Sequence, residues 1–330
     1  MEVSALDTAA RPRVTVVVPA YGRTALLKTA VESLLDQDLP GEEYEVIVVD
    51  SSPDDRNQQM VDSLRVPSGC SVTCLRKSAE GPGPSRNLGA RSGRAPVIAF
   101  MDSDCQAGRG WLRAGLAAFD DGVGIVQGKV LPVPGAPHNI FNRTLRVEAE
   151  SFLYETANIF YRRDAFEQAG GFPASELSPN ALFPFGGEDV ALAWGVKRAG
   201  WQTRFSAEAL VLHVVFRITP WQWLVDKHMY ICPRIVRDFP ETRRFFYRGY
   251  FFDRVQAALV LGLVSAAAAV LSSGWAGVGI LPYLWVRGSE PTVALRGPLR
   301  LLRVGFYLPR DLISLALLAA GSLRFRALLL

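Results

Sequence analysis

Three runs in the first third of the chain are apolar without polar alternation. Residues 14–21 and 44–50 are rich in valine, and residues 97–104 pass from an apolar run into two aspartates. Such runs are typical of strands that are buried on both faces of a parallel sheet. We therefore predict three buried strands, the last of which ends in an acidic pair.

Segments between and after these runs have apolar residues at helical spacing. It is clearest over residues 24–35 and weaker over residues 58–64 and 108–119, and a short apolar stretch at residues 72–75 favours a further strand. Strands that alternate with helices imply a parallel sheet with right-handed crossovers. Ligands bind such sheets beyond the carboxyl ends of the strands, so that edge is where we expect a site.

Polar or turn-forming residues end each long strand at this edge, namely Pro19, Asp50 and Asp102. Asp102 and Asp104 share one face if the strand geometry persists that far. Two carboxylates so close repel each other unless a cation lies between them, and a hard divalent ion accepts both carboxylate and phosphate oxygens. The pair therefore predicts a metal-bridged phosphate site, with capping of the following helix as the alternative.

A glycine- and proline-rich loop at residues 81–84 precedes Ser85 and Arg86. We predict that Ser85 caps a helix that starts at Arg86. A cation in the first turn of a helix is unfavourable for that helix, so Arg86 indicates an anionic partner; a solvated arginine is the equally weighted alternative.

Several short motifs follow one another along the chain, at residues 16–21, 48–50, 83–89, 100–104, 158–166, 170–172, 187–194, 199–201 and 211–213. In this order they resemble the inverting glycosyltransferases of family 2, of the membrane-associated bacterial type. The resemblance covers roughly residues 13–240 and implies an α/β GT-A fold, a Rossmann-like and mostly parallel sheet flanked by helices.

The resemblance implies a nucleotide-sugar donor and a divalent metal, Mn²⁺ or Mg²⁺. Asp104 would bind the metal directly, Asp102 would contact the ribose or the metal through water, and His213 would be a third ligand, with a core histidine as its alternative. An imidazole ligand favours Mn²⁺ over Mg²⁺. The nucleotide-binding residues implied by the resemblance are Pro19, Ala20, Tyr21, Asp50, Arg86, Asp102 and Ser103.

The resemblance also implies an acidic catalytic motif. Asp189 is our candidate for the general base and Glu188 the second choice; the alternative is that both carboxylates favour a helix N-terminus. The candidate acceptor-binding residues are Asn158, Gly187 and Trp194.

Two positions depart from the family pattern. After Asp50 the family usually has an acidic, glycine-rich turn, whereas residues 51–55 here read Ser-Ser-Pro-Asp-Asp. Cys105, directly after the acidic pair, is not the commonest choice either. The departures bear on recognition of the base and remove no proposed catalytic carboxylate.

The chain of 330 residues has a formal charge of only +4, which does not favour nucleic acid as a partner. We expect a flexible tail at residues 1–12, a glycosyltransferase domain at 13–240 and an appended helical region at 241–330. Its four cysteines have no zinc-site spacing and predict free thiols in a reducing compartment. No N-terminal signal peptide is recognisable.

The appended region has the composition of a membrane-associated segment. Residues 255–286 carry no charge and predict a tight hairpin of two short helices, with a turn at 272–274. Arginine on both flanks places both ends on the cytoplasmic side of the inner membrane. Residues 304–323, interrupted at 309–311, predict an interfacial helix, and the aromatic and basic residues of 221–253 predict further contact with membrane lipid.

The leading function is transfer of a sugar from a nucleotide donor, with a UDP-sugar as first choice, to a hydroxyl on a glycan, a lipid-linked molecule or a small metabolite. A polyprenyl-phosphate glycosyltransferase is the narrower alternative. A nucleotidyltransferase is disfavoured because the loop after the first strand has one glycine, Gly22. A non-catalytic membrane scaffold with this fold is the alternative from another class.

Overall fold

A computed structural model describes residues 12–137, 139–174, 186–271, 274–289 and 300–330. The chain separates into two compact units, Met1–Arg217 and Ile218–Leu330. The tail predicted at residues 1–12 lies outside the described residues, except for Pro12, which is buried. The domain boundary expected near residue 240 stays a prediction.

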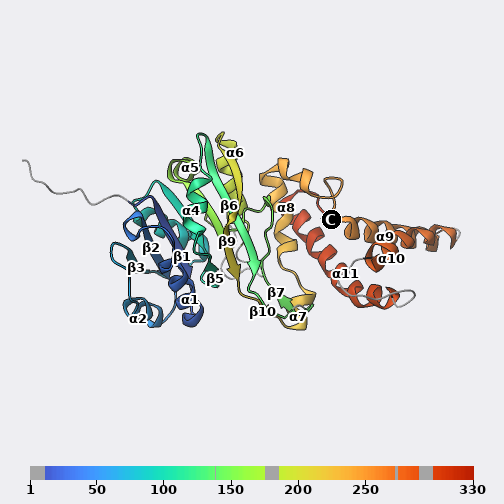
Figure 1. Ribbon diagram of the computed structural model, residues 1–330. Helices are drawn as coiled ribbons and strands as arrows, with labels where there is room; N and C mark the ends of the chain where they lie inside the picture. The colour runs from blue at the N-terminus through green and yellow to red at the C-terminus, as the bar shows by residue number, and fades with distance from the viewer. Residues whose placement is uncertain (1–11, 138, 175–185, 272–273, 290–299) are drawn as a thin grey trace, which may run out of the picture. The chain divides into compact units, whose positions relative to one another are not determined.

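The first unit is built on one mixed sheet of eight strands in the order β3-β2-β1-β4-β8-β6-β9-β5 (Figure 1). A two-stranded ribbon pairs β7 with β10. The strands are β1 (Val14–Ala20), β2 (Tyr44–Asp50), β3 (Ser71–Arg76), β4 (Val97–Met101), β5 (Cys105–Ala107), β6 (Val123–Pro132), β7 (Asn142–Arg143), β8 (Asn158–Arg162), β9 (Gln202–His213) and β10 (Phe216–Arg217).

The sheet is mostly parallel, which confirms the predicted α/β class. β3, β2, β1 and β4 run parallel to one another, and β6 runs parallel to β9. β8 is antiparallel to both of its neighbours, β4 and β6, and β5 is antiparallel to β9. Every residue of β2 and β4 is buried, as their largely apolar sequences favour.

Helices flank this sheet (Figure 1). They are α1 (Thr24–Leu35), the 3₁₀ turn η1 (Gly41–Glu43), α2 (Arg56–Asp62), α3 (Pro82–Ser92), α4 (Trp111–Ala117), α5 (Arg163–Gln168) and α6 (Glu188–Arg198). The first helix has the predicted bounds, because its buried residues Leu27, Ala30, Val31 and Leu34 recur at helical spacing. The close approach of α3 to β1 requires Gly89, where a Cβ would overlap the side chain of Val17.

Two local predictions at the functional edge are wrong. The strand β4 ends at Met101, so Asp102 and Asp104 lie in a turn and not on one strand face. The helix α3 begins at Pro82 with Gly81 at its N-cap, so Ser85 does not cap it and Arg86 lies beyond its first turn. Proline is well suited to the first turn of a helix, which explains the earlier start.

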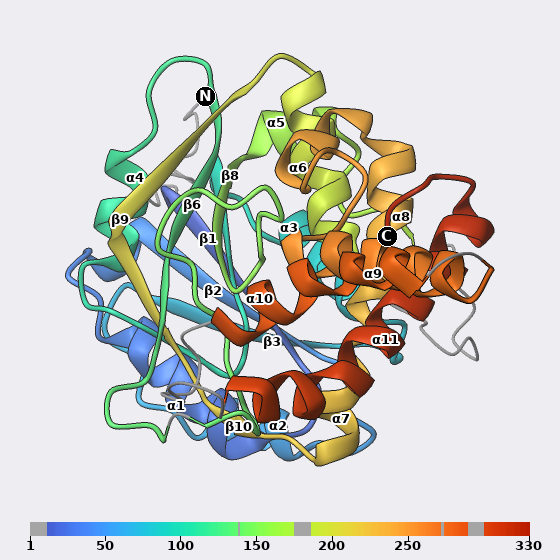
Figure 2. The same ribbon diagram turned by 90° about the vertical axis from the view of Figure 1, so that its right-hand side faces the viewer.

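The second unit is helical in its described residues (Figure 2). Its elements are α7 (Pro220–Leu224), α8 (His228–Asp238), the 3₁₀ turns η2 (Pro240–Phe245) and η3 (Gly274–Ile280), α9 (Arg254–Leu271), α10 (Leu281–Ser289) and α11 (Arg300–Phe325). By length and composition, Arg254–Leu271 and Leu302–Phe325 are two weak membrane-span candidates, with mean hydropathies of 1.9 and 1.3. Most of the turn predicted at residues 272–274 lies outside the described residues.

The interruption predicted at residues 309–311 is absent, because α11 continues through Pro309. Asp311 is buried on this helix and accepts hydrogen bonds from Tyr283 Oη at 2.8 Å and Arg287 Nε at 2.7 Å, both from α10. The charge that suggested a helix end therefore has an internal partner, and the two helices pack around it.

Candidate active site

A cavity of about 550 Å³ opens at the carboxyl ends of β1, β2 and β4. It lies at the sheet edge that the sequence predicts, because parallel strands end together there. Of the predicted nucleotide-binding residues, all but Asp50 line it. The lining residues are Pro19, Ala20, Tyr21, Arg23, Ser51, Ala79, Gly81, Pro82, Ser85, Arg86, Asp102, Ser103 and Asp104.

The turn after β4 directs its two aspartates to different partners. Asp102 Oδ1 accepts a hydrogen bond from Arg86 Nη2 at 2.8 Å, and Asp104 Oδ2 accepts one from Arg23 Nη1 at 3.1 Å. Arg23 is a left-handed residue, with φ of 50°, between β1 and α1. No sequence pattern singles out Arg23 as a site residue, since only the folded turn brings it to Asp104.

His213 meets Asp104 at the end of β9. Its Nε2 lies 3.7 Å from Asp104 Oδ1, an oxygen that is buried and has no hydrogen-bond partner in the described residues. His213 Nδ1 lies 2.6 Å from the carbonyl of Val214 and 3.2 Å from Thr144 Oγ1, while Nε2 faces Asp104. The structure thus brings together two of the three predicted metal ligands.

The Asp104 carboxyl is in a setting that favours a bound cation. Its pKa is raised by burial first and by the negative charge of Asp102 second, and His213 and Arg23 counteract only part of this. Asp104, His213 and the neighbouring Cys105 offer ligand atoms that lie within 4.8 Å of one another. An oxygen and an imidazole nitrogen facing each other suit Mn²⁺, so the residues present fit a divalent metal.

Arg86 connects this acidic turn to the second acidic motif. It is buried on α3, and its Nη1 lies 3.7 Å from Glu188 Oε1 while its Nη2 bonds to Asp102. Burial lowers the pKa of the guanidinium, but the charges of Asp102, Asp189 and Glu188 raise it by more. Its Nε is buried without a hydrogen-bond partner, which leaves one donor unused in the described residues.

Glu188 and Asp189 form the first turn of α6, after Gly187 at its N-cap with φ of 82°. Burial raises the pKa of Asp189 to about 7, the charge of Glu188 adds to the shift, and Arg86 opposes it. Thr156 Oγ1 lies 3.5 Å from Asp189 Oδ2. Near neutral pH, Asp189 is therefore present in both its protonated and its deprotonated form, and the deprotonated form can act as a general base.

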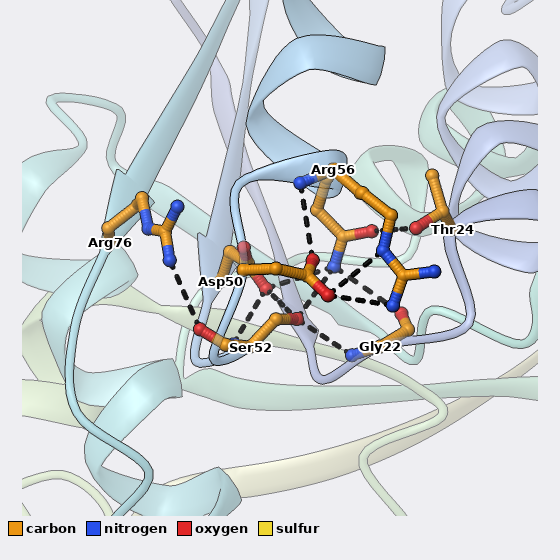
Figure 3. A network of polar contacts seen from close by, with 8 residues as sticks. Gly22, Thr24, Asp50, Ser52, Arg56 and Arg76 are labelled. Carbon is orange, nitrogen blue, oxygen red and sulfur yellow. Dashed lines mark hydrogen bonds and ion pairs between the residues drawn. The ribbon is translucent and has the colours of Figure 1, made fainter.

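Asp50, predicted to bind the base, is buried at the end of β2 within a polar network (Figure 3). Its Oδ1 accepts hydrogen bonds from the Ser52 backbone N–H at 3.0 Å, Ser52 Oγ at 2.5 Å and Asn57 Nδ2 at 2.9 Å. Its Oδ2 has no hydrogen-bond partner among the described residues. Asp50 is thus adjacent to the cavity rather than part of its wall.

Two of the predicted acceptor-binding residues do not reach the cavity. Asn158 is fully buried, where Trp111 Nε1 donates to its side chain at 2.7 Å and it donates to the carbonyls of Lys129 and Ala209. Trp194 is buried on α6 and donates to the carbonyl of Phe152. These positions assign both side chains to the packing of the sheet and its helices, and only Gly187, beside the acidic motif, remains close to the site.

The family model described as Glycosyl transferase family 2 matches residues 15–174. Glycosyltransferase AglE of Haloferax volcanii is 24% identical over 62% of this chain and 68% of its own length. The pre-mycofactocin glycosyltransferase of Mycobacterium tuberculosis is 30% identical over 66% of this chain, which spans 46% of that relative.

A solved structure gives the same fold. Mannosyltransferase PcManGT from Pyrobaculum calidifontis, in complex with GDP-Man and Mn²⁺, aligns with a TM-score of 0.55 over 96% of this chain and 87% of its own. The sequences are 18% identical, so the likeness concerns the fold. Asp189 and His213 both lie beyond the part matched by the family model.

Proposed function

The chain belongs to glycosyl transferase family 2, and from this membership we propose that it moves a sugar, with inversion, from a nucleotide-sugar donor to a hydroxyl acceptor. PcManGT, of the same fold, was solved with a nucleotide sugar and Mn²⁺. The cavity at the ends of β1, β2 and β4 is the proposed donor site, with Pro19, Ala20 and Tyr21 forming one wall and Ser103 lying on the acidic turn.

The observation that carries this proposal is the position of Arg86 between two acidic groups. On one side it bonds to Asp102, and on the other it lies near Glu188, next to Asp189 with its pKa of about 7. Asp102 lies on the side of the proposed nucleotide site, and Glu188 lies beside the proposed general base. A cation between them suits a reaction in which a diphosphate leaves while an acceptor loses a proton. Arg86 lines the proposed donor site, where its guanidinium can bind a phosphate oxygen.

A divalent metal, Mn²⁺ or Mg²⁺, would be held by Asp104 and His213, with Asp102 nearby. The fit rests on the buried Asp104 Oδ1, which has no hydrogen-bond partner in the described residues, and on His213 Nε2, which lies 3.7 Å from it. When bound, such an ion neutralises the charge that develops on a leaving diphosphate.

The chain's own residues supply the other requirements. Asp189 accepts the proton of the acceptor hydroxyl, and Thr156 keeps its carboxylate oriented. Arg86 binds the diphosphate, and Gly187 lets the acceptor approach the start of α6 closely. A single displacement assisted by one general base inverts the anomeric centre.

The test is release of nucleoside diphosphate from a panel of nucleotide sugars by detergent-purified protein with Mn²⁺. We expect slow hydrolysis of one donor, abolished by EDTA and by Asp104→Ala. With acceptor present, Asp189→Asn is expected to lower turnover by about 10²- to 10⁴-fold while donor binding is retained. Loss of donor binding in Asp189→Asn would instead assign this residue to the donor site.

The acceptor class is tested by the same variant. A polyprenyl phosphate is already ionised and needs little help from a base, so Asp189→Asn would then matter much less. One relative, from Mycobacterium tuberculosis, is named pre-mycofactocin glycosyltransferase. A severe loss in Asp189→Asn favours a hydroxyl on a glycan, a lipid-linked molecule or a small metabolite.

We further propose attachment to the inner membrane through residues 241–330, with the catalytic domain in the cytoplasm. The apolar helices α9 and α11 support it, and so do the exposed Val270, Leu271 and Trp285. Fractionation that recovers the chain in the soluble fraction without detergent would contradict it. A protein that binds no nucleotide and turns over no donor would favour the scaffold alternative.

A further inference from the structure

We propose that Arg23 couples the divalent metal to the diphosphate: it holds Asp104 in a neutral pair and gives this carboxylate up to the metal when a diphosphate binds the arginine instead. The proposal rests on the proposed function, because it concerns the metal and the nucleotide of that site. It is carried by the position of Arg23, which lines the cavity and also bonds to the candidate metal ligand.

The turn after β4 is acidic in sequence, but each of its two aspartates is paired with an arginine. Asp104 Oδ2 accepts a hydrogen bond from Arg23 Nη1 at 3.1 Å, and Asp102 Oδ1 accepts one from Arg86 Nη2 at 2.8 Å. A divalent ion gains less from a carboxylate whose charge is already compensated, and the nearby guanidinium repels it. The metal alone should therefore bind this turn weakly.

The two arginines differ in how firmly they are held. Arg86 is buried, with 6% of its side chain exposed, and it also faces Glu188. Arg23 has 56% of its side chain exposed, and Asp104 is its one ion-pair partner among the described residues. Its Cζ also lies 4.6 Å from the centroid of the Phe216 ring on β10. Because exposed ion pairs are weak, Arg23 is the arginine that can leave its carboxylate at little cost.

The backbone of Arg23 is fixed although its side chain is exposed. Its φ of 50° is left-handed, and its carbonyl accepts hydrogen bonds from the N–H groups of Leu26 and Leu27 at the start of α1. Glycine adopts this conformation without strain, whereas arginine does so at a cost that its side-chain contacts must offset. The guanidinium can move by side-chain rotation alone, with the start of α1 unchanged.

The second oxygen of Asp104 is not satisfied by the arginine. Oδ1 is buried without a hydrogen-bond partner in the described part of the chain, and it lies 3.7 Å from His213 Nε2. The Phe216 ring packs edge-on against His213, with centroids 6.1 Å apart, so this one ring contacts both His213 and Arg23. Arg23 thus compensates the charge of Asp104 without satisfying its buried oxygen, which remains for the metal.

A diphosphate in the cavity changes this balance of charge. Its oxygens accept charge-assisted hydrogen bonds from guanidinium N–H groups, and Arg23 gives only Nη1 to Asp104 among the contacts described. An Arg23 that turns toward the phosphates takes its positive charge away from Asp104 and adds it to the diphosphate. The metal then meets an uncompensated carboxylate together with the diphosphate. Binding of either ligand therefore favours the other, and the coupling is reciprocal.

The test measures two affinities separately on the full-length protein in detergent. Binding of Mn²⁺ without nucleotide is followed by electron paramagnetic resonance. Binding of UDP, dTDP and GDP at saturating Mn²⁺ is followed by calorimetry. In Arg23→Gln we expect Mn²⁺ alone to bind roughly 10-fold more tightly, because the opposing charge is gone. The nucleoside diphosphate that wild type binds best is expected to bind about 10-fold more weakly, because its contact with the arginine is lost.

The two expected changes have opposite signs, whereas a variant that merely loses structure would weaken both affinities. Arg23→Lys keeps the positive charge, and its affinity for Mn²⁺ alone is expected to stay within about 3-fold of wild type. The matched control is Arg109→Gln, which removes an arginine from an exposed pair with Asp36 at 3.5 Å. No change in either affinity is expected in this control.

Weaker or unchanged Mn²⁺ binding in Arg23→Gln would overturn the inference, and so would unchanged binding of the nucleoside diphosphate. Mn²⁺ binding that is equally tight in Arg23→Lys and Arg23→Gln would overturn it as well, because charge would not be the cause. Metal-dependent nucleotide binding by wild type would leave the proposed function standing in each of these cases. A wild-type protein that bound neither Mn²⁺ nor any of the three nucleoside diphosphates would overturn both.

Discussion

Each unit of the protein has an arginine–aspartate pair whose arginine is buried, and the two pairs differ in the hydrogen bonds they leave unmade. In the second unit, Asp311 is almost fully buried, and both of its oxygens are held by Arg287, with Tyr283 adding a third donor. In the first unit, Asp102 has 31% of its side chain exposed, and Arg86 keeps an unpartnered Nε.

The difference separates a structural pair from a reactive one. A fully satisfied pair between α10 and α11 has no capacity left for a ligand and serves to align the two helices. The Arg86 pair lines a cavity and faces two further carboxylates, Glu188 and Asp189. Unused hydrogen-bonding capacity next to a cavity is therefore a better sign of function than burial of charge.

The largest expected effect is on the pair in the second unit. Asp311→Leu leaves Arg287 buried without its counter-charge and is expected to lower the free energy of unfolding by about 3–5 kcal/mol. The measurement is thermal unfolding of the detergent-solubilised protein. The double variant Arg287→Met with Asp311→Leu removes both charges and should recover most of the loss. A double variant as unstable as the single one would show that the loss of stability does not come from the uncompensated charge of Arg287.

Arg86→Gln is expected to affect chemistry more than stability. Removing this positive charge takes away the influence that lowers the pKa of Asp189, so the pKa should rise above about 7. A base must be deprotonated, so the rising limb of the pH–rate profile should move to higher pH, and turnover at neutral pH should fall by roughly 10- to 100-fold. An unchanged pH–rate profile would show that Arg86 does not influence the pKa of the general base.

Asp189→Asn tests the raised pKa of Asp189 through the pH dependence of folding stability. The pKa of Asp189 in the folded protein, about 7, lies above the ordinary aspartate value of 3.8, so between these two pH values the folded protein binds one more proton than the unfolded chain. The carboxyl therefore destabilises the fold progressively as pH rises from about 4 to 7, and fully above that range. The variant should gain more stability relative to wild type at pH 8 than at pH 5, measured by thermal unfolding. An equal difference at both pH values would contradict the raised pKa.

The smallest effect is expected at an exposed pair. Arg56 and Asp54 are joined at 2.7 Å on the surface, with most of the arginine exposed. Solvent and salt screen such pairs, so Arg56→Ala should leave the unfolding temperature and donor binding unchanged. A measurable loss would mean that this pair supports the nearby Asp50 network, which shares its turn (Figure 3).

Much of the donor-side site is predictable from local sequence. The valine-rich sequences of β1 and β2 predict strands buried on both faces, and parallel strands bring Pro19 and Asp102 to one edge. The acceptor-side predictions are poorer. Asn158 and Trp194 lie in motifs that suggest acceptor binding, but their side chains donate hydrogen bonds to backbone carbonyls in the interior. A motif alone does not distinguish a ligand-binding side chain from a structural one.

By itself, the sequence determined the α/β class, the order of the early elements, the edge of the sheet where the acidic turn lies and the family resemblance. These depend on periodicity and on short motifs, which are local properties of the chain. Only the tertiary structure decided that His213 faces Asp104, that Arg86 joins Asp102 to Glu188, and that Arg23 pairs with Asp104. Such pairings depend on burial and on distances between residues far apart in the chain, which no local pattern encodes.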